Sequence, residues 1–384
     1  MRSIIRGTVM AAAALLAATP AFAQQDESAA FVVTIGNDTL AVEKFTRTRD
    51  RITGEVVSRS PRTVTRSYTA VLNPDGTVQR VEMTSRSPAG NQPPTVTHVD
   101  FTADSAFTRI QRGDSVATYR LAAVQPFPLV GYSHAFYEQA MMHARGRRAD
   151  SLQVAIVPVG ANQSYAVTMR TVGADSVRLS NIAGVQRVAT DARGRLLGLN
   201  GMESTQKFIV TRVRDIDVDA YAAEFARRDA AQQGMGALSP RDSAVADIGG
   251  AHVAVDYGRP FKRGRVIFGE VVPWGEVWRT GANAATGFTT TRDLRIGGVQ
   301  VPAGKYTLFT LPSQQGWKLI INRKTGQWGT EYEAGEDLAR IDMQTRKLDT
   351  AVEGFTIRVE PQGQGGVLRL QWDDTEAFVP FTVQ

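Results

Sequence analysis

Hydrophobic and polar residues alternate over short stretches along most of this chain, which is the pattern of β-strands buried on one face. Clusters of Gly, Pro, Asn and Asp separate these stretches at residues 36–38, 73–76, 173–175 and 191–194, where the backbone must reverse. In the first half of the chain the pattern predicts strands that include residues 67–72, 77–85, 151–159, 165–172 and 176–179. We therefore predict an antiparallel β-meander or half-barrel in this half.

Two stretches show the period of a helix instead. The first, at residues 133–144, begins at Ser133, which can cap the first turn, and its predicted buried stripe is Phe136, Tyr137, Ala140, Met141 and Ala144. The second, at residues 220–231, follows Asp219 as the predicted N-cap and places Tyr221 and Phe225 on one face. We expect the first helix to pack against the sheet and the second to end the domain.

A segment without periodicity marks the predicted domain boundary. Residues 232–240 read QQGMGALSP and contain two glycines, which is typical of a linker. We predict a β-rich N-terminal domain at residues 24–231, a linker at 232–237 and a second domain at 238–384. All five tryptophans lie in the second domain, so the two domains differ in composition.

The second domain is predicted to be an antiparallel β-sandwich. Gly297 and Gly298 between two short alternating runs indicate a two-residue hairpin. Roughly nine or ten short strands at this spacing favour two packed sheets. The predicted strands are residues 252–257, 288–291, 294–296, 299–301, 305–311, 317–322, 338–343, 354–360, 367–372 and 377–383. The fold class is therefore mainly β throughout, with one or two helices in the N-terminal domain.

The first 23 residues have the features of a secretory signal peptide. Arg2 and Arg6 precede an apolar run, and Ala21 and Ala23 form the small-residue pattern at which signal peptidase cleaves. We expect cleavage after Ala23 and a periplasmic or secreted mature protein. The apolar run is too short to span a bilayer, and we predict no transmembrane anchor.

Composition excludes several classes of function. The chain of 384 residues contains no Cys, which rules out disulfides, thiol catalysis and thiolate-bound metals. Without the two arginines of the signal peptide, 42 basic residues stand against 38 acidic ones, a formal charge of +4. The basic residues are scattered rather than clustered, so we predict no nucleic-acid partner. The sequence carries no signal for an oligomeric state.

The usual catalytic and metal-binding patterns are missing. The four histidines form no zinc-ligand spacing, and no phosphate loop or dinucleotide fingerprint occurs. Acidic clusters at residues 215–219, 331–337 and 373–376 contain the oxygen ligands that calcium prefers, with Asp215, Asp217 and Asp219 expected on one strand face. None of the clusters follows a calcium-loop pattern, so we expect solvated turns and strand ends. We predict no catalytic residues, no metal and no cofactor.

One region resembles a known family. The motifs are GRVIFG at residues 264–269, VPWG at 272–275, VWRTGAN at 277–283 and PAGKY at 302–306, with Trp317, Asn322 and Trp328-Gly329 downstream. In this order they closely resemble the bacterial family catalogued as domain of unknown function 2911. The resemblance covers the second domain and implies an exported bacterial protein of unassigned biochemistry. Members usually read GANEAT where this chain reads GANAAT at residues 281–286, with Ala284-Ala285 and no acid.

The stretch from Trp274 to Thr286 is the strongest candidate for a binding site. Its indoles can stack on a sugar or an apolar ligand, while its polar side chains direct hydrogen bonds. The alternative is structural: the same residues could pack in the interior of the sandwich and fix a loop through side-chain to backbone hydrogen bonds. In an extended strand Trp278 and Arg279 point to opposite faces, so a turn is needed to bring both into one pocket. The ligand-binding candidates are Arg265, Trp274, Trp278, Arg279, Asn283, Thr286, Lys305, Trp328 and Glu331.

These features lead to three functional hypotheses. The preferred one is a non-enzymatic, exported binding protein whose Trp-rich sandwich recognises a glycan or another small ligand. The second is carriage of lipid or other apolar cargo by the N-terminal sheet, which loosely resembles the open half-barrels of bacterial envelope carriers. The simpler alternative is that the helix only covers the core of this sheet. The third is a hydrolase that uses Arg279 with nearby carboxylates.

Overall fold

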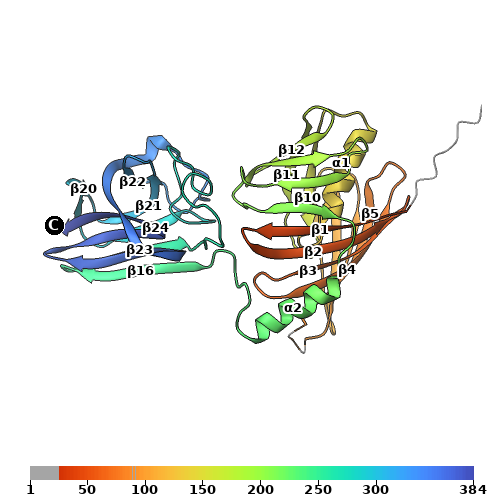
Figure 1. Cartoon of the computed structure of the whole chain (residues 1–384), viewed down its shortest axis with the longest axis horizontal. Coiled ribbons are helices and arrows are strands. Elements are labelled where there is room, and N and C mark those ends of the chain that lie inside the picture. Colours follow the sequence, from red (N-terminus) through yellow and green to blue (C-terminus); the bar gives the residue numbers. More distant parts are fainter. Residues whose placement is uncertain (1–25, 89, 91) are drawn as a thin grey trace, which may run out of the picture.

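The structure, a computed structural model, describes residues 26–88, 90 and 92–384. The predicted signal peptide therefore lies outside the described residues. The described chain is mainly β and contains two largely antiparallel sheets, which confirms the predicted fold class (Figure 1). No helix among these residues is both long enough and apolar enough to cross a bilayer.

The N-terminal sheet has fifteen strands in the order β8-β7-β6-β5-β4-β3-β2-β1-β15-β14-β13-β12-β11-β10-β9. Its two arms, β1–β8 and β9–β15, are meanders joined by the pairing of β1 with β15. The strands are β1 (Glu27–Ile35), β2 (Asp38–Arg47), β3 (Arg51–Ser58), β4 (Val64–Leu72), β5 (Val78–Arg86), β6 (Thr95–Phe101), β7 (Ser105–Arg112), β8 (Ser115–Ala122), β9 (Pro126–Leu129), β10 (Ser151–Pro158), β11 (Tyr165–Thr171), β12 (Ser176–Asn181), β13 (Gly184–Thr190), β14 (Leu196–Asn200) and β15 (Ile209–Val213).

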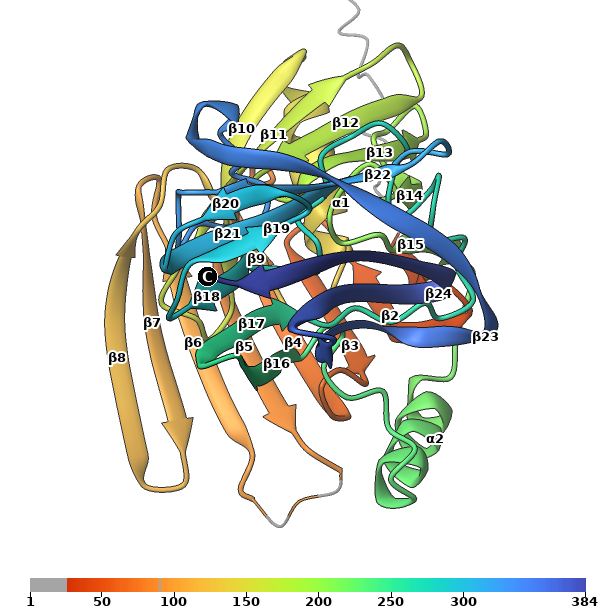
Figure 2. The same cartoon turned by 90° about the vertical axis from the view of Figure 1, so that its left-hand side faces the viewer.

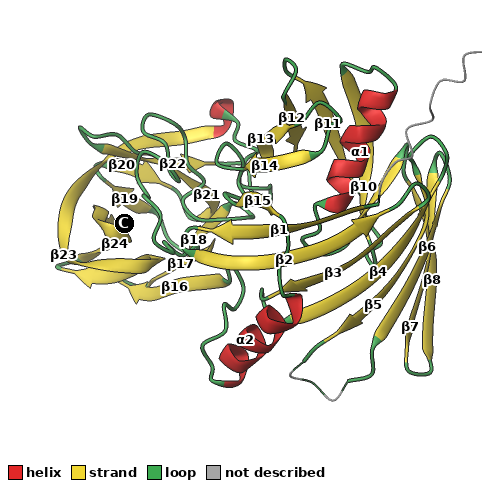
Figure 3. Cartoon of the chain, turned by 45° about the vertical axis from the view of Figure 1, so that its right-hand side comes forward, coloured by secondary structure: helices red, strands yellow, loops and turns green. Residues whose placement is uncertain are grey.

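Helix α1 (Ala135–Gly146) lies inside the curve of this sheet, between its two arms (Figure 3). It connects β9 to β10, the one parallel pair of the sheet, and a parallel pair requires such a crossover. The predicted stripe of α1 is buried and belongs to the same apolar core as both arms. The helix therefore fills the concave face.

The N-terminus of α1 is capped from the sheet and not by Ser133. The N-cap residue is His134, whose side chain makes no capping bond. Glu43 of β2 instead accepts hydrogen bonds from the backbone N–H groups of His134 (2.6 Å) and Ala135 (3.2 Å) and from the hydroxyl of Tyr68. A carboxylate here satisfies free N–H groups and complements the helix dipole. Burial nevertheless raises the pKa of Glu43 above its ordinary value.

A second buried carboxylate joins α1 to three strands. Glu138 is fully buried and accepts from Arg47 of β2 (2.5 Å), from Arg212 of β15 (2.5 Å) and from the backbone N–H of Leu196 in β14 (2.7 Å). Glu27 of β1 bonds the same two arginines from outside. Ionic groups are stable in an apolar core only when they are paired in this way.

Helix α2 (Val218–Ala230) packs on the outer face of the N-terminal sheet. Phe225 and Val218 form a small core with Val42 of β2 and Val57 of β3. The prediction of Asp219 as N-cap was wrong by two residues, because the N-cap is Asp217, whose side chain accepts from the N–H of Ala220 (2.9 Å). The three aspartates at 215–219 therefore do not share a strand face.

The C-terminal sheet has nine strands in the order β16-β17-β18-β21-β22-β23-β24-β19-β20 around one core. Two pairs of predicted strands are single long strands, β23 and β24, which run through both halves of the bent sheet (Figure 2). The strand at 241–248 was not predicted. The strands are β16 (Arg241–Ile248), β17 (Ala251–Gly258), β18 (Thr286–Thr290), β19 (Leu294–Ile296), β20 (Val299–Val301), β21 (Gly304–Leu311), β22 (Trp317–Asn322), β23 (Asp337–Gln362) and β24 (Gly365–Val383), with a 3-10 turn at Ala334–Glu336.

The two sheets touch where the turn between β1 and β2 meets the loop around residue 263. The N–H of Asn37 donates to the carbonyl of Arg263 (3.0 Å), and the Arg263 guanidinium pairs with Asp38 (3.0 Å). The contact is close, because a Cβ on Gly36 would lie 2.0 Å from the Arg263 carbonyl oxygen. This contact places the loops of the C-terminal sheet opposite the end of the N-terminal sheet.

The Glu138→Gln variant tests the buried ionic network. It leaves the guanidinium of Arg47, which is 2% exposed, without its buried carboxylate, and such a change costs about 3–5 kcal/mol of unfolding free energy. Urea unfolding followed by far-UV circular dichroism should show this loss, since all five tryptophans lie in the C-terminal half. Glu224→Gln, which breaks surface pairs with Arg227 and Arg228, should cost less than about 1 kcal/mol. Equal losses of unfolding free energy in the two variants would contradict a stabilising role for the buried network.

The buried His134 predicts acid sensitivity. Burial lowers the pKa of His134 from 6.5 to about 4, so the unfolded chain binds a proton more readily than the folded one in this interval. Stability from this group is therefore present above about pH 6.5 and is lost as the pH falls to about 4, by roughly 3 kcal/mol. His134→Asn should flatten the pH dependence of the melting temperature over this window relative to that of the unchanged protein. A slope unchanged by His134→Asn would refute the assignment.

Candidate functional site

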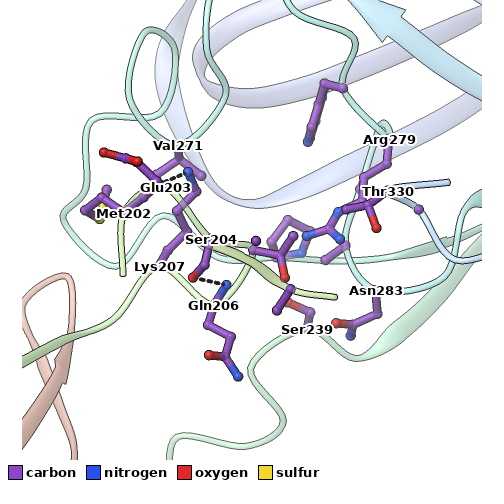
Figure 4. A pocket seen from close by; sticks show the side chains of 18 of the residues that line it. Met202, Glu203, Ser204, Gln206, Lys207, Ser239, Val271, Arg279, Asn283 and Thr330 are labelled. Carbon is purple, nitrogen blue, oxygen red and sulfur yellow. Dashed lines mark hydrogen bonds between the residues drawn. The ribbon is translucent and has the colours of Figure 1, made fainter. Parts of the chain in front are cut away.

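A cleft of about 950 Å³ lies between the two sheets (Figure 4). Its N-terminal wall combines apolar side chains at the end of the sheet, among them Leu40, Tyr132 and Phe208, with the polar loop at residues 202–207. Its C-terminal wall consists of loops that precede β18 and β23, together with Trp372 of β24. The size is that of pockets which enclose small organic molecules.

A sharp turn after Trp278 brings two candidate residues to this cleft together. Trp278 exchanges backbone hydrogen bonds with Thr310 of β21 (2.7 and 2.9 Å), and the chain then turns at Thr280, whose φ is 52°. A β-branched residue with positive φ is strained, and such strain is often found at functional sites. The turn resolves the problem raised by the sequence, because Trp278 and Arg279 both line the cleft.

Arg279 is the most unusual polar group of the cleft. Its Nη1 atom is buried and has no hydrogen-bond partner, and no described residue forms an ion pair with its guanidinium. Burial lowers the pKa of Arg279 from 12.5 to about 10, so the group stays charged at neutral pH. A Cβ on Gly329 would lie 2.4 Å from Cδ of Arg279, so the glycine lets the arginine stem pass against the backbone.

Two further cations line the cleft. Lys207 of the N-terminal wall donates to the carbonyl of Met202, and its pKa is lowered first by burial and then by the charges of Arg265 and Arg279. Arg265 donates to the carbonyls of Phe261 and Lys262 (3.0 Å to the latter), so its guanidinium is satisfied by the backbone. The charges of the three groups therefore act on the same space from both walls.

Three carboxylates also line the cleft. Glu203 pairs with Arg187 (2.6 Å), which holds its pKa below the ordinary value. Glu270 and Glu276 are exposed. The Glu276 charge raises the pKa of Lys207 and so opposes the neighbouring cations. None of these carboxylates pairs with Arg279.

The structure brings together five of the nine candidates from the sequence. Arg265, Trp278, Arg279, Asn283 and Trp328 line the cleft. Trp278 is also part of the core, where it stacks on Trp372 at 5.9 Å. Trp328 is 40% exposed.

The other four candidates lie outside the lining of the cleft. Trp274 stacks on Phe268 (5.7 Å). Thr286 is fully buried and donates to the carbonyl of Thr280 (2.7 Å), which holds the turn. Lys305 is exposed on β21, and Glu331 accepts from the N–H of Trp328 (2.9 Å).

The sequence analysis missed the N-terminal wall. Lys207, Ser204 and Gln206 come from a loop about 70 residues before the candidate segment, and nothing in their local pattern points to the C-terminal sheet. The one available signal was the dense polar run at residues 202–207 in a part of the chain with only one other lysine, Lys44.

The acidic clusters are paired with nearby cations. Lys324 binds Glu333 (2.5 Å), Arg340 binds Asp337 (2.9 Å) and Lys262 binds Asp373 (2.5 Å). Across the described ranges, no group of three or more His, Asp or Glu side chains has an arrangement that could hold a metal ion.

Comparisons with known proteins give a family for the C-terminal part. No curated protein matches the chain. Solved structures with low similarity include a DUF1089 family protein from Pseudomonas aeruginosa (13% identity, TM-score 0.32, 42% of this chain and 90% of that one). Another is a β-barrel-like protein of domain of unknown function DUF1849 from Brucella abortus (9% identity, TM-score 0.34, covering 49% of this chain and 95% of that one). Residues 239–381 match the family described as protein of unknown function (DUF2911), so the C-terminal domain of this chain belongs to the family that its motifs resemble.

Proposed function

We propose that this chain is an exported binding protein that holds a small organic ligand in the cleft between its two sheets and does not transform it. The observation that carries the proposal is the cleft itself, about 950 Å³ in volume and lined from both sheets. Export rests on the signal-like pattern of residues 1–23 alone.

The lining of the cleft supports a ligand with both an apolar and a polar part. Trp328 offers an exposed indole, and Ile182, which is 66% exposed, offers apolar surface on the opposite wall. Asn283 and Ser204 add neutral groups that can form directed hydrogen bonds. A few polar groups converging on a mainly apolar cleft are typical of small-molecule sites, and stacking on an indole also suits a sugar ring.

The site differs from the one first expected on the sandwich alone. The N-terminal half of the chain supplies 14 of the 34 lining residues, so a ligand in the cleft touches both halves. Its binding free energy then also stabilises their relative orientation, because a ligand favours the arrangement in which it makes most contacts.

The two alternative functions find less support in the geometry. A hydrolase acting through Arg279 needs a carboxylate beside the guanidinium, and no described residue pairs with it. Carriage of apolar cargo in the N-terminal sheet would require α1 to leave the concave face, where Phe136, Ala140 and Met141 are buried.

Two tryptophans of similar exposure provide a matched test of the cleft. The mature protein is screened against oligosaccharides and polar metabolites by thermal shift, and the strongest binder is then titrated by calorimetry. Trp328→Ala should weaken its binding about tenfold, because stacking on an indole contributes roughly 1–2 kcal/mol. Trp274→Ala, at 36% exposure against 40% for Trp328, should change the affinity less than about twofold.

Two outcomes would refute the proposal. The first is a folded protein that binds no compound of the screen. The second is an equal loss of affinity in Trp274→Ala and Trp328→Ala, which would place the ligand outside the cleft.

A further inference from the structure

We propose that the cleft recognises an organic anion, with Arg279 binding the carboxylate or phosphate group of the ligand. This inference rests on the proposed ligand-binding function and specifies the chemical class of the ligand. It is carried by the geometry of Arg279 and by the charges that surround the same space.

The first argument is that half-buried Arg279 has a buried N–H group without a partner. A guanidinium carries five N–H donors, and burial removes water from the Nη1 donors. In a folded protein such donors are normally satisfied, because each buried and unpaired polar group costs free energy. Arg279 leaves Nη1 buried without an acceptor, and the described chain offers its guanidinium no carboxylate. A bound anion would supply two acceptor oxygens in the geometry that a guanidinium prefers.

The second argument comes from three other arginines of the same chain that are buried or half-buried. Arg47 and Arg212 share the carboxylate of Glu138, and Arg265 donates to two backbone carbonyls. A further buried arginine, Arg59, lies over the ring of Phe225 (5.1 Å) instead. Each of the first three has a structural partner, as a residue with a purely structural role should. Arg279 is the exception among these four, and it is the one that lines the cleft without protein acceptors.

The third argument is that the chain holds Arg279 in place without bonding its head group. The strained turn at Thr280 is fixed by hydrogen bonds from Thr280 and Thr286, and Gly329 allows close contact with the arginine stem. Figure 4 shows Arg279 beside Thr330 on one side of the pocket and Lys207 on another. A fixed guanidinium binds an anion with little loss of side-chain entropy.

The fourth argument is electrostatic. The pKa of Lys207 is lowered first by burial and then by the charges of Arg265 and Arg279 on the opposite wall, so Lys207 is repelled by both. An anion between the two walls would convert this repulsion into attraction on both sides. Among the acids of the lining, Glu203 is already held by Arg187, and Glu270 and Glu276 stay exposed. The positive charge of Arg279 is therefore not neutralised by an acid of the lining, and a bound anion could neutralise it.

Matched pairs of charged and neutral probes test this inference. Phenyl phosphate is compared with phenol, and phenylacetate with phenylacetamide, by calorimetry at constant ionic strength. We expect the anion of at least one pair to bind at least about tenfold more tightly than its neutral partner, since a charged hydrogen bond contributes roughly 1.5–3 kcal/mol. The pair with the larger ratio identifies the ligand as a phosphate or a carboxylate.

Variants assign the preference to one side chain. Arg279→Gln should reduce the ratio to less than about threefold while the neutral probes bind as before. Arg295→Gln, at the one exposed position of β19, removes the same formal charge outside the cleft and should leave the ratio unchanged. Because Arg279 is unpaired, Arg279→Gln should also keep or raise the melting temperature of the ligand-free protein. A structural arginine would instead lower it by several degrees.

The outcomes separate this inference from the proposed function. Equal binding of charged and neutral probes, an equal effect of Arg295→Gln, or a lower melting temperature of ligand-free Arg279→Gln would each overturn the anion site. If no probe binds but the broader screen finds a ligand sensitive to Trp328→Ala, the anion site fails and the binding function stands. If the screen also finds nothing, both fail.

Discussion

The buried carboxylate of Glu138 is the contact on which the N-terminal half depends. It is fully buried and joins α1 to β2, β14 and β15. With Glu43 at the helix start, it holds an amphipathic helix inside the sheet, between two arms that the pairing of β1 with β15 joins. Two buried carboxyl side chains near one end of the helix fix its position through directed hydrogen bonds.

The hydrogen bonds at the start of α1 also position residues that line the cleft. Tyr132 lies two residues before the N-cap of α1, and the ring of His134 packs against Phe208 at 5.9 Å. Tyr132 and Phe208 both line the cleft. The position of the N-terminal wall therefore follows from the hydrogen bonds that Glu43 accepts, and the contact of Arg263 with Asp38 places the opposite wall.

The arginines of this chain show how one residue type serves two purposes. Where a guanidinium finds a carboxylate or a carbonyl, it links strands and loops, as Arg47 and Arg263 do. Where it is held against Gly329, as Arg279 is, the folded protein retains a buried N–H group that no described residue accepts. A buried donor without an acceptor departs from the usual rules of protein structure, and such departures are expected at functional sites. The Ala284-Ala285 pair beside it offers no acid, unlike the usual GANEAT motif of the family that the segment resembles.

The local sequence pattern was sufficient to predict the fold class, one helix and the family of the C-terminal domain. Alternation predicted a mainly β chain, the stripe from Phe136 to Ala144 predicted α1, and successive short motifs identified the family of residues 239–381. These features depend on neighbours within a few positions. Tertiary structure alone decided which carboxylate caps α1, since Glu43 lies 91 residues before His134. It also joined the predicted strands into β23 and β24, and it separated Trp328 and Arg279 in the cleft from Trp274 outside it. Contacts between distant segments made these choices, and no local periodicity records them.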